Sequence, residues 1–135
     1  MKGETDLAIL LRQMKPLLNA GEYVFCSAGE MNEKYCQKAI GMFREKEGVT
    51  FIVDKAIANE LHLSYHFVCS WITITAHSSL EAVGLTAAFS TALSNEGISC
   101  NVVAAFYHDH IFVAQKDAAK AMKVLESFRQ PGDPV

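Results

Sequence analysis

The sequence lacks any apolar run close to the roughly 20 residues that a membrane-spanning helix needs, although 50% of its 135 residues are hydrophobic. The apolar part of its opening, MKGETDLAILLRQMK, is too short and too interrupted for a signal peptide. Basic residues are not in excess either, since the formal net charge is −3, and nucleic-acid-binding proteins usually carry a basic face. We therefore expect a folded, cytoplasmic protein that binds neither a membrane nor a nucleic acid.

Cysteine pairs and the common catalytic signatures are absent as well. The four cysteines, Cys26, Cys36, Cys69 and Cys100, form no CxxC pair and lie in or beside apolar stretches, as reduced, buried thiols often do. The sequence contains no P-loop, GxSxG, HExxH or dinucleotide-binding fingerprint. It therefore predicts no cofactor and no metal site, and it favours a protein that is not an enzyme.

What the sequence does contain is a regular succession of helical and extended patterns. In the first half, an apolar stripe predicts a helix that is capped by Thr5 or Asp6 and ended by the segment NAG. The stripe consists of Leu7, Leu10, Leu11, Met14, Leu17 and Leu18. After it we expect a strand in EYVFCSA, a polar linker in GEMNEKYCQK, two strands (AIGMF and VTFIV) around the loop REKEG, and a short helix in DKAIANELHL.

The second half is patterned more clearly. The run Phe67–Ala76 is rich in β-branched and aromatic residues and predicts a strand. A second apolar stripe, closed by Gly97, predicts a helix. Two more strands, ISCNVVAAFY and HIFVA, precede a final amphipathic helix that ends near Phe128. The second half therefore reads strand–helix–strand–strand–helix.

Each half is close to the βαββαβ ferredoxin-like unit, so the expected fold class is α+β. The second half has no sequence left for a strand after its last helix, and the first has no strand before its first helix. We hypothesise two packed modules with antiparallel sheets that complete one shared architecture. The modules would be residues 1–66 and 67–130, with 131–135 as a frayed tail.

The segment HSSLEAVGL, His77–Leu85, carries the strongest local signal. Ser78 and Glu81 have the spacing of a capping box, in which each side chain bonds the other residue's backbone N–H. Gly84 would then lie inside the helix, where glycine costs roughly 1 kcal/mol relative to alanine unless a ligand or a neighbouring backbone approaches closely. Free N–H groups at a helix start bind carboxylates. The segment fits two interpretations, a ligand site or a simple helix cap.

Three stretches in order, HSSLEAVGLTAAFS, GISCNVVA and YHDHIFV, resemble the small-molecule-binding ACT domain, in the branch of short bacterial proteins built from two ACT-like halves. EYVFCS and FREKEGVTFIV resemble the same branch less distinctively. The resemblance implies a ferredoxin-like fold and a regulatory, amino-acid-sensing role. It also implies a ligand site where the first strand–helix loop faces a neighbouring domain, with Gly84 as the loop glycine. The sequence departs from enzyme-linked members, which have an Asp and a Pro ahead of that glycine.

This interpretation places the carboxylate of an amino acid against backbone N–H groups around Ser79 to Gly84. The predicted ligand-binding residues are His77, Ser78, Ser79, Leu80, Glu81, Val83, Gly84, Leu85, Asn101 and Val102. Asn101 and Val102 would add hydrogen bonds from the following strand, and the leucines and Val83 would supply apolar contact. Unpaired sheet edges further predict a homo-oligomer, most simply a dimer.

The stretch AFYHDHIFV places His108 and His110 on either side of Asp109. Asp and His tolerate turns, so a tight connection between two strands is the favoured interpretation. In an extended chain both histidines would face one side, which suits two metal ligands. A small metal-dependent or acid–base enzyme using His77, His108, Asp109 and His110 is therefore one alternative. A protein–protein interaction module with exposed strand edges is another.

Overall fold

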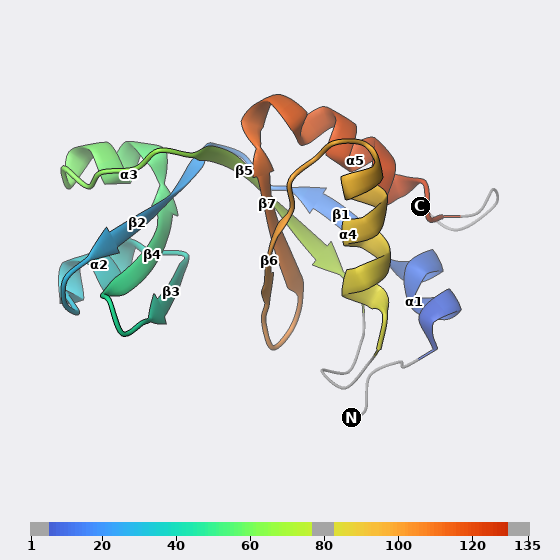
Figure 1. Ribbon diagram of the computed structural model, residues 1–135, viewed down its shortest axis with the longest axis horizontal. Helices are drawn as coiled ribbons and strands as arrows, with labels where there is room; N and C mark the ends of the chain where they lie inside the picture. The colour runs from blue at the N-terminus through green and yellow to red at the C-terminus, as the bar shows by residue number, and fades with distance from the viewer. Residues whose placement is uncertain (1–5, 77–82, 130–135) are drawn as a thin grey trace. The chain divides into compact units, whose positions relative to one another are not determined.

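The computed structural model of the protein describes residues 6–76 and 83–129, which form two compact units (Figure 1). The first, which we call the inserted unit, is Ala20–Ser70. The second, the split unit, combines the described parts of Met1–Asn19 and Trp71–Val135. The inserted unit therefore interrupts the sequence of the split unit, and strand β5 (Val68–Thr75) contributes residues to both.

The inserted unit contains every element of the order βαββαβ. Its elements are β2 (Tyr23–Ala28), α2 (Glu33–Lys38), β3 (Gly41–Arg44), β4 (Val49–Asp54), α3 (Lys55–Glu60) and the first residues of β5. The strands lie in the order β3-β4-β2-β5, with antiparallel pairing at each step. This is the ferredoxin-like arrangement, complete within one unit.

The core of the inserted unit follows from the period-two alternation of its strands. Side chains that point to one face of β2 and β4 are buried together with Ala58 of α3. They are Val24, Cys26, Val49, Phe51 and Val53. Tyr35 of α2 packs edge-on against the Phe51 ring, with centroids 5.6 Å apart. Each such burial stabilises the fold by roughly 1.5–3 kcal/mol, so α2 and α3 are held on this face.

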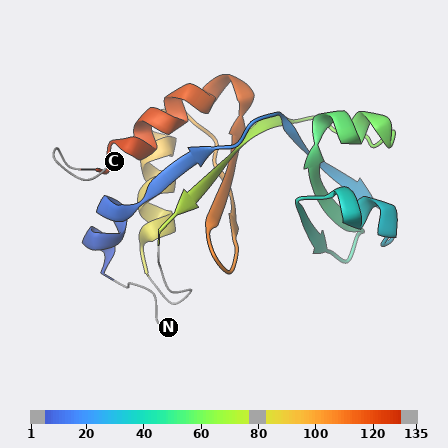
Figure 2. The same cartoon turned by 180° about the vertical axis from the view of Figure 1, so that it is seen from behind.

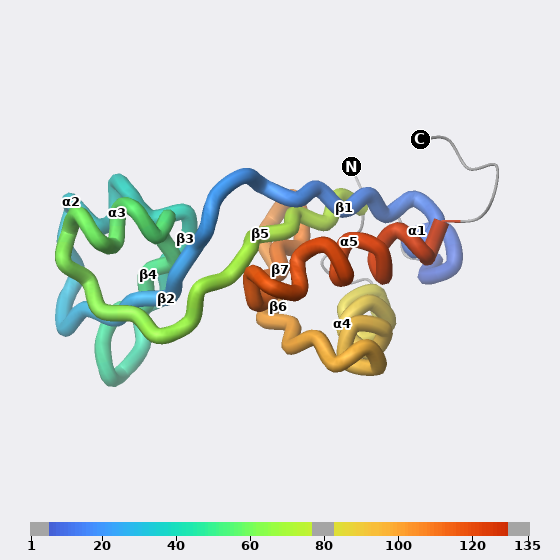
Figure 3. Tube along the Cα trace, turned by 90° about the horizontal axis from the view of Figure 1, so that it is seen from above, coloured from blue at the N-terminus to red at the C-terminus, as the bar shows by residue number. Residues whose placement is uncertain are grey.

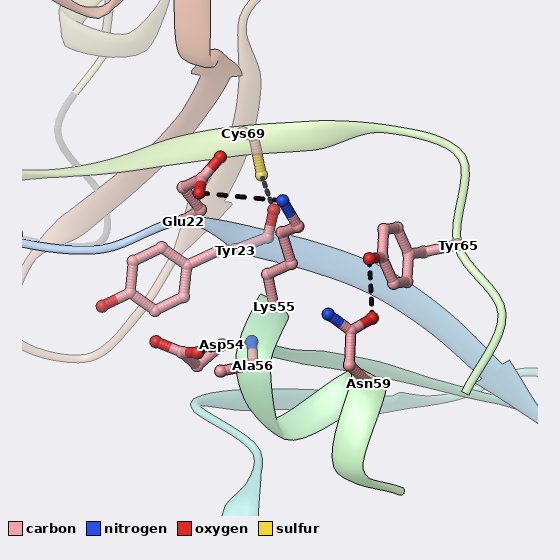
Figure 4. Close-up of polar contacts among 8 residues, drawn as sticks. All are labelled: Glu22, Tyr23, Asp54, Lys55, Ala56, Asn59, Tyr65 and Cys69. Carbon is pink, nitrogen blue, oxygen red and sulfur yellow. Dashed lines mark hydrogen bonds and ion pairs between the residues drawn. The ribbon is translucent and has the colours of Figure 1, made fainter. Parts of the chain in front are cut away.

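Polar contacts join the start of β2 to β5 and to the start of α3 in the inserted unit, as Figure 4 shows. The thiol of Cys69 donates to the Tyr23 carbonyl at 3.1 Å. The Lys55 ammonium lies 3.8 Å from a Glu22 carboxylate oxygen (Figure 4). Asp54 Oδ1 accepts from the backbone N–H two residues along the chain at 2.8 Å and so caps α3. These contacts hold the start of α3 against β2.

The split unit has the same architecture with its elements in a different chain order (Figure 2). Its elements are α1 (Leu7–Gln13), β1 (Lys15–Leu18), the rest of β5, α4 (Leu85–Asn95), β6 (Asn101–Ala104), β7 (Asp109–Ala114), the short 3₁₀ helix η1 (Gln115–Asp117) and α5 (Ala118–Glu126). The strand order is β1-β5-β7-β6. The order β5, α4, β6, β7, α5 and β1 again gives βαββαβ, with β1 as the final strand. Helix α1 and the short helix η1 are additions to this order.

The helices of the split unit cover one face of its sheet. Ile72 and Ile74 of β5 and Ile111 and Val113 of β7 point to this face and are at most 1% exposed. They form one core cluster with helical side chains that are themselves fully buried. Those side chains are Leu10 and Met14 from the α1 region, Phe89 and Leu93 of α4, and Ala121 and Leu125 of α5. The opposite face of the sheet carries the polar residues described below.

The hypothesis that a strand is missing from the second half is confirmed, and β1 supplies it. Lys15 pairs with Thr75 and Leu18 with Ile72, antiparallel to β5. The prediction of one helix through Leu18 was wrong, because α1 ends at Gln13 and the chain continues into β1 (Figure 3). Pro16 explains the difference, since proline has no N–H for the helical ladder and disfavours helical geometry in the residue before it.

The prediction that the first half lacks a strand before its first helix was wrong. The predicted polar linker contains helix α2, and strand β2 precedes that helix. Asn32 caps this helix by accepting from the N–H groups of Lys34 and Tyr35 at 2.9 and 3.3 Å. With α2 counted, β2 becomes the first strand of a complete unit. The linear division at residues 66 and 67 also differs from the spatial grouping, which places Met1–Asn19 with the second unit. The pairing of β1 with β5 is the physical reason.

Helix α4 starts later than the capping-box pattern predicts. It begins at Leu85, directly after Gly84, so Ser78 and Glu81 do not occupy its capping positions. Both residues lie outside the described part of the chain. Among the described helices, none is both long enough and apolar enough to span a bilayer.

Candidate functional site

The start of α4 is formed by a glycine in a backbone conformation that other residues rarely adopt. Gly84 has φ +96° and ψ −14°, in the left-handed region. Its carbonyl accepts from the Ala88 N–H at 2.9 Å. A Cβ at Gly84 would lie 3.1 Å from a methyl carbon of Leu7 in α1. Backbone conformation and close packing, rather than a position inside the helix, therefore explain this glycine.

Gly84 itself cannot cap the helix start, because glycine has no side chain. Gly84 is the N-cap residue and makes no side-chain hydrogen bond to the first turn. The first N–H groups of a helix have no partner within the helix, and here they belong to Leu85, Thr86 and Ala87. They point out of the positive end of the helix dipole. This arrangement suits a carboxylate.

The described residues of the predicted site do not all lie together. Val83 is 82% exposed beside the helix start, whereas Leu85 is buried in the core and is not available to a ligand. Asn101 and Val102 begin β6, at the opposite end of α4 from Gly84 (Figure 1). His77, Ser78, Ser79, Leu80 and Glu81 lie outside the described residues. Within the split unit, therefore, the two parts of the predicted site are separated by the length of α4.

The β6–β7 connection lies at the same end of the sheet as the start of α4. β5 and β6 run in the same direction, so β5 ends, and the β6–β7 turn occurs, at this end (Figure 1). The turn is closed by a 3.0 Å bond from Ala105 N to the His108 carbonyl. The prediction that the His108–Asp109 pair lies where the two strands reverse is confirmed for His108, whereas Asp109 already belongs to β7.

Two exposed aromatic side chains occupy this turn. Phe106 and Tyr107 are 77% and 79% exposed, and their rings meet edge to face at 4.9 Å. Both residues belong to the predicted strand ISCNVVAAFY, since they continue an apolar run. The sequence signal that places them outside the strand is the His-Asp pair that follows, because this pair ends the apolar run. The end of the sheet at which α4 starts therefore presents exposed aromatic surface.

A chain of polar side chains lies on the sheet face opposite the helices. The Asn19 amide donates to Thr73 Oγ1 at 2.9 Å, and Thr73 Oγ1 lies 3.2 Å from His110 Nδ1. The Trp71 indole N–H donates to the same ring nitrogen at 2.9 Å. Thr73 is only 8% exposed, so its hydroxyl needs these partners. Trp71 also packs against Phe112, with ring centroids 6.4 Å apart, so it serves both packing and hydrogen bonding.

This network fixes the protonation of His110. Since the Trp71 N–H can only donate, Nδ1 of His110 must be its unprotonated nitrogen. Burial lowers the pKa of His110, the nearby His108 lowers it further, and Asp109 partly opposes the change. Burial in turn raises the pKa of the Asp109 carboxyl, and His110 partly opposes that change. His110 is therefore held as a neutral acceptor.

The geometry gives little support to the metal-site alternative. The His108 and His110 rings lie edge to face with centroids 6.3 Å apart, and Nδ1 of His110 already accepts from Trp71. Across residues 6–76 and 83–129, no group of three or more His, Cys, Asp or Glu side chains is placed to hold a metal ion. His77, the third proposed ligand, falls outside this part of the chain.

A hydroxyl-rich pocket lies at the far end of α4. Its volume is about 400 Å³. It is lined by Ser90, Thr91, Ser94, Ile98, Ser99 and Cys100, which lead directly into Asn101 at the start of β6. Burial raises the pKa of the Cys100 thiol to about 11, so this cysteine is neutral near pH 7 and is a weak nucleophile. The pocket supplies hydrogen-bonding groups rather than catalysis.

Comparison with known families identifies both halves of the chain. A family model described as ACT domain matches residues 2–70, and a second ACT domain model matches residues 67–127. No curated protein matches the chain. The overlap of the two matches falls on the first residues of β5.

Solved structures share the fold along most of the chain. A Vibrio cholerae protein of unknown function, described as a possible transport protein, is 46% identical over 92% of this chain and 96% of that one, with a TM-score of 0.84. A protein of Agrobacterium tumefaciens is 17% identical over 86% and 89%, with a TM-score of 0.68. The regulatory subunit of aspartate kinase from Thermus thermophilus, in its ligand-free form, is 11% identical over 85% and 96%, with a TM-score of 0.64.

Proposed function

Because this chain belongs to the ACT domain family, we propose that it is a regulatory protein that binds an amino acid and has no catalytic activity of its own. The family matches cover both halves, and a solved structure of the same fold is named as a regulatory subunit of aspartate kinase. The observation that carries the proposal is the start of α4 at Gly84, an N-cap residue that has no side chain to occupy the first-turn N–H groups. An α-carboxylate is the group that this helix start suits best.

The energetics favour a carboxylate at the N-terminus of α4. An anion near a helix N-terminus gains typically about 0.3–1 kcal/mol when exposed and up to ~2 kcal/mol when partly buried. Direct bonds from the first-turn N–H groups add to this because the acceptor is charged. Phe106 and Tyr107 lie at the same end of the sheet and supply apolar surface for a ligand side chain.

A second copy of the chain would bring the two parts of the predicted site together. α4 has 11 residues, about 16 Å at 1.5 Å per residue, so Gly84 and Asn101 of one copy cannot hold one small ligand. β6 is an edge strand, and a two-fold axis would pair it antiparallel with β6 of a partner. The start of the partner's β6, with its hydroxyl-rich pocket, would then lie at the Gly84 end of this copy.

The proposal is therefore a homodimer with two ligand sites. In each site, the α4 start and the residues before it, from His77 to Gly84, would receive the carboxylate. Asn101 and Val102 of the other copy would contribute hydrogen bonds. Asn101 is exposed, and its amide donates to the Phe112 carbonyl at 3.2 Å, which leaves its own oxygen as an acceptor for an ammonium group.

Thermal unfolding in the presence of each of the twenty amino acids tests this function. A ligand at 100 times its Kd stabilises the native state by about 2.7 kcal/mol, which raises the midpoint temperature measurably. The Val83→Asp variant should remove this stabilisation, because its carboxylate would repel the ligand's carboxylate at an 82% exposed position with little cost to folding.

Ala119→Asp provides the matched control. Ala119 is exposed like Val83 and lies in the first turn of another helix of the same unit, α5, so the charge change is equal but distant from the proposed ligand. The control should keep the response of the natural protein. An amino acid that stabilises Val83→Asp as strongly as the natural sequence would contradict a site at α4. Light scattering that shows a monomer with ligand bound would contradict the two-copy arrangement alone.

A further inference from the structure

Three sulfur atoms converge on the surface of the inserted unit. The Cys36 sulfur lies 3.2 Å from the Met31 sulfur and 3.6 Å from the Met42 sulfur. Cys36 is on α2, Met31 precedes that helix, and Met42 is on the edge strand β3. The two methionines are 36% and 44% exposed, so solvent reaches the cluster. We call Met31, Cys36 and Met42 the sulfur cluster.

The fold, rather than chance contact of flexible side chains, brings these sulfurs together. Met42 is in register with Phe51 of β4, so both side chains point to the same face of the sheet. Phe51 is fully buried beneath α2 and contacts Tyr35. Met42 therefore faces α2 as well, and Cys36 lies on that helix one residue after Tyr35. The neighbouring Phe43 points to the other face and is 71% exposed.

Local hydrogen bonds hold the helix that carries Cys36. Asn32 Oδ1 accepts from Lys34 N and Tyr35 N, and the Asn32 carbonyl accepts from Cys36 N at 3.0 Å. Met31 directly precedes this cap. All three sulfur-bearing side chains thus belong to segments of the backbone with defined positions. A metal site built from a small number of ligands requires this.

From this arrangement we propose that the sulfur cluster is a binding site for a soft monovalent metal ion, Cu(I). One thiolate and two thioethers form the donor set that favours Cu(I) over the divalent ions that prefer nitrogen or oxygen. Among the described residues, Cys36 belongs to no group of three or more His, Cys, Asp or Glu side chains that could hold a metal ion, which argues against zinc. Metal binding would release the thiol proton of Cys36 and give a neutral complex.

The spacing of the sulfurs requires only a small adjustment. Three ligands around one ion, each with a metal–sulfur bond of about 2.3 Å as for zinc thiolates, lie about 4 Å from one another. The present separations of 3.2 and 3.6 Å are shorter by less than 1 Å. Methionine has three rotatable side-chain bonds and accommodates such a change easily. Rotation of the methionine side chains can therefore lengthen both separations from the Cys36 sulfur to the spacing that an ion requires.

The test is a Cu(I) titration of the full chain under anaerobic, reducing conditions, with bicinchoninate as the competing chelator. We expect one Cu(I) per chain to be held against the chelator. Replacing Cys36 by Ser, or Met31 and Met42 together by Leu, should weaken binding by more than tenfold, since loss of even an outer-shell partner costs about 10–100-fold. Raising the pH should strengthen binding, because a proton is released.

Cys100→Ser is the control, because it removes a thiol from the split unit, where burial raises the thiol pKa to about 11. It should leave Cu(I) binding unchanged. Methyl NMR of methionine gives a second readout: the signals of Met31 and Met42 should shift with Cu(I), and those of Met14 and Met122 should not. Equal affinity in the Met31/Met42 variant, equal loss in Cys100→Ser, or no competition with the chelator would each overturn the proposal.

Discussion

His110 shows how a single side chain can make folding stability depend on pH. Its ring accepts from Trp71 through Nδ1, and its pKa in the folded protein lies below the ordinary value of about 6.5. A histidine with a lowered pKa stabilises the fold above the unfolded-state pKa, and that contribution is lost as the pH falls. Protonation of Nδ1 would also remove the acceptor for the Trp71 N–H and bring two N–H groups into repulsive contact.

We therefore predict that the free energy of unfolding falls as the pH is lowered from 7 towards 5. His110→Gln should show a smaller fall, because glutamine has an acceptor for Trp71 and does not titrate. Urea unfolding at a series of pH values measures this. His66→Gln is the control, since His66 is exposed in the inserted unit. A pH profile of His110→Gln equal to that of the natural protein would show that the network does not control the titration.

Gly84 illustrates what the sequence could and could not predict at a single residue. Its importance was visible, because a glycine in an apolar helical pattern requires a reason. The reason itself was not visible, because it depends on φ of +96° and on Leu7, which is distant in sequence. A bulky substitution at Gly84 is consequently a poor test of ligand binding, since the strained backbone alone costs about 1–3 kcal/mol.

At the scale of elements, the sequence predicts the type of most helices and strands but misses two short elements, α2 and β1. Strand β5 and helices α4 and α5 agree with the predicted type, because a sustained periodicity identifies them. Helix α2 was missed because its six residues contain no full apolar stripe. Strand β1 was missed because its leucines continue the helical spacing of α1, and only Pro16 contradicts that pattern.

The aromatic turn and the polar network were hard to predict for a different reason. Phe106 and Tyr107 extend an apolar run, so pattern alone assigns them to β6. The contacts of Trp71 with His110 and of Asn19 with Thr73 join residues far apart in the sequence. No local signal specifies such pairs. The register of β1 and β7 against β5 creates them.

Helix caps permit a prediction at this scale. Asp6 accepts from the N–H groups of Ala8 and Ile9 in α1 at 3.0 and 3.3 Å, and Asn32 caps α2 in the same way. Asp6→Ala and Asn32→Ala should each lower the free energy of unfolding by about 1 kcal/mol, measured by urea denaturation. Their Ser variants are the controls and should recover most of the loss, because serine also caps well. A loss in Ala variants that serine does not reduce would assign the effect to other contacts.

At the scale of the whole molecule, the split unit explains which fragments can fold. The ACT domain match to residues 67–127 omits β1, whose pairing covers one edge of β5. It also omits Leu10 and Met14, which are fully buried in the core. Losing two such side chains removes several kcal/mol, a large fraction of the stability of a small domain.

We predict that residues 67–129 alone do not form a cooperative fold. A permuted chain, in which a short flexible linker joins residue 129 to residues 6–19, should fold, since all elements of the split unit are then present in the order βαββαβ. Circular dichroism during thermal unfolding distinguishes the two by a cooperative transition in the permuted chain only. A cooperative transition of the same midpoint in both would show that β1 is dispensable.

The position of β1 in the sequence also determines the order in which the chain can fold during synthesis. The ribosome releases Lys15–Leu18 long before the strand that pairs with it, so β1 emerges without a partner while Leu17 and Leu18, both partly exposed even in the folded protein, face the solvent. Ala20–Ser70 can close first, since its βαββαβ elements are contiguous. Long-range pairing slows folding because the intervening chain must be ordered. A chain that has released Ala20–Ser70 but not yet α4 and α5 would therefore contain all elements of the inserted unit, whereas Leu10 and Met14 would still lack the core partners that α4 and α5 provide.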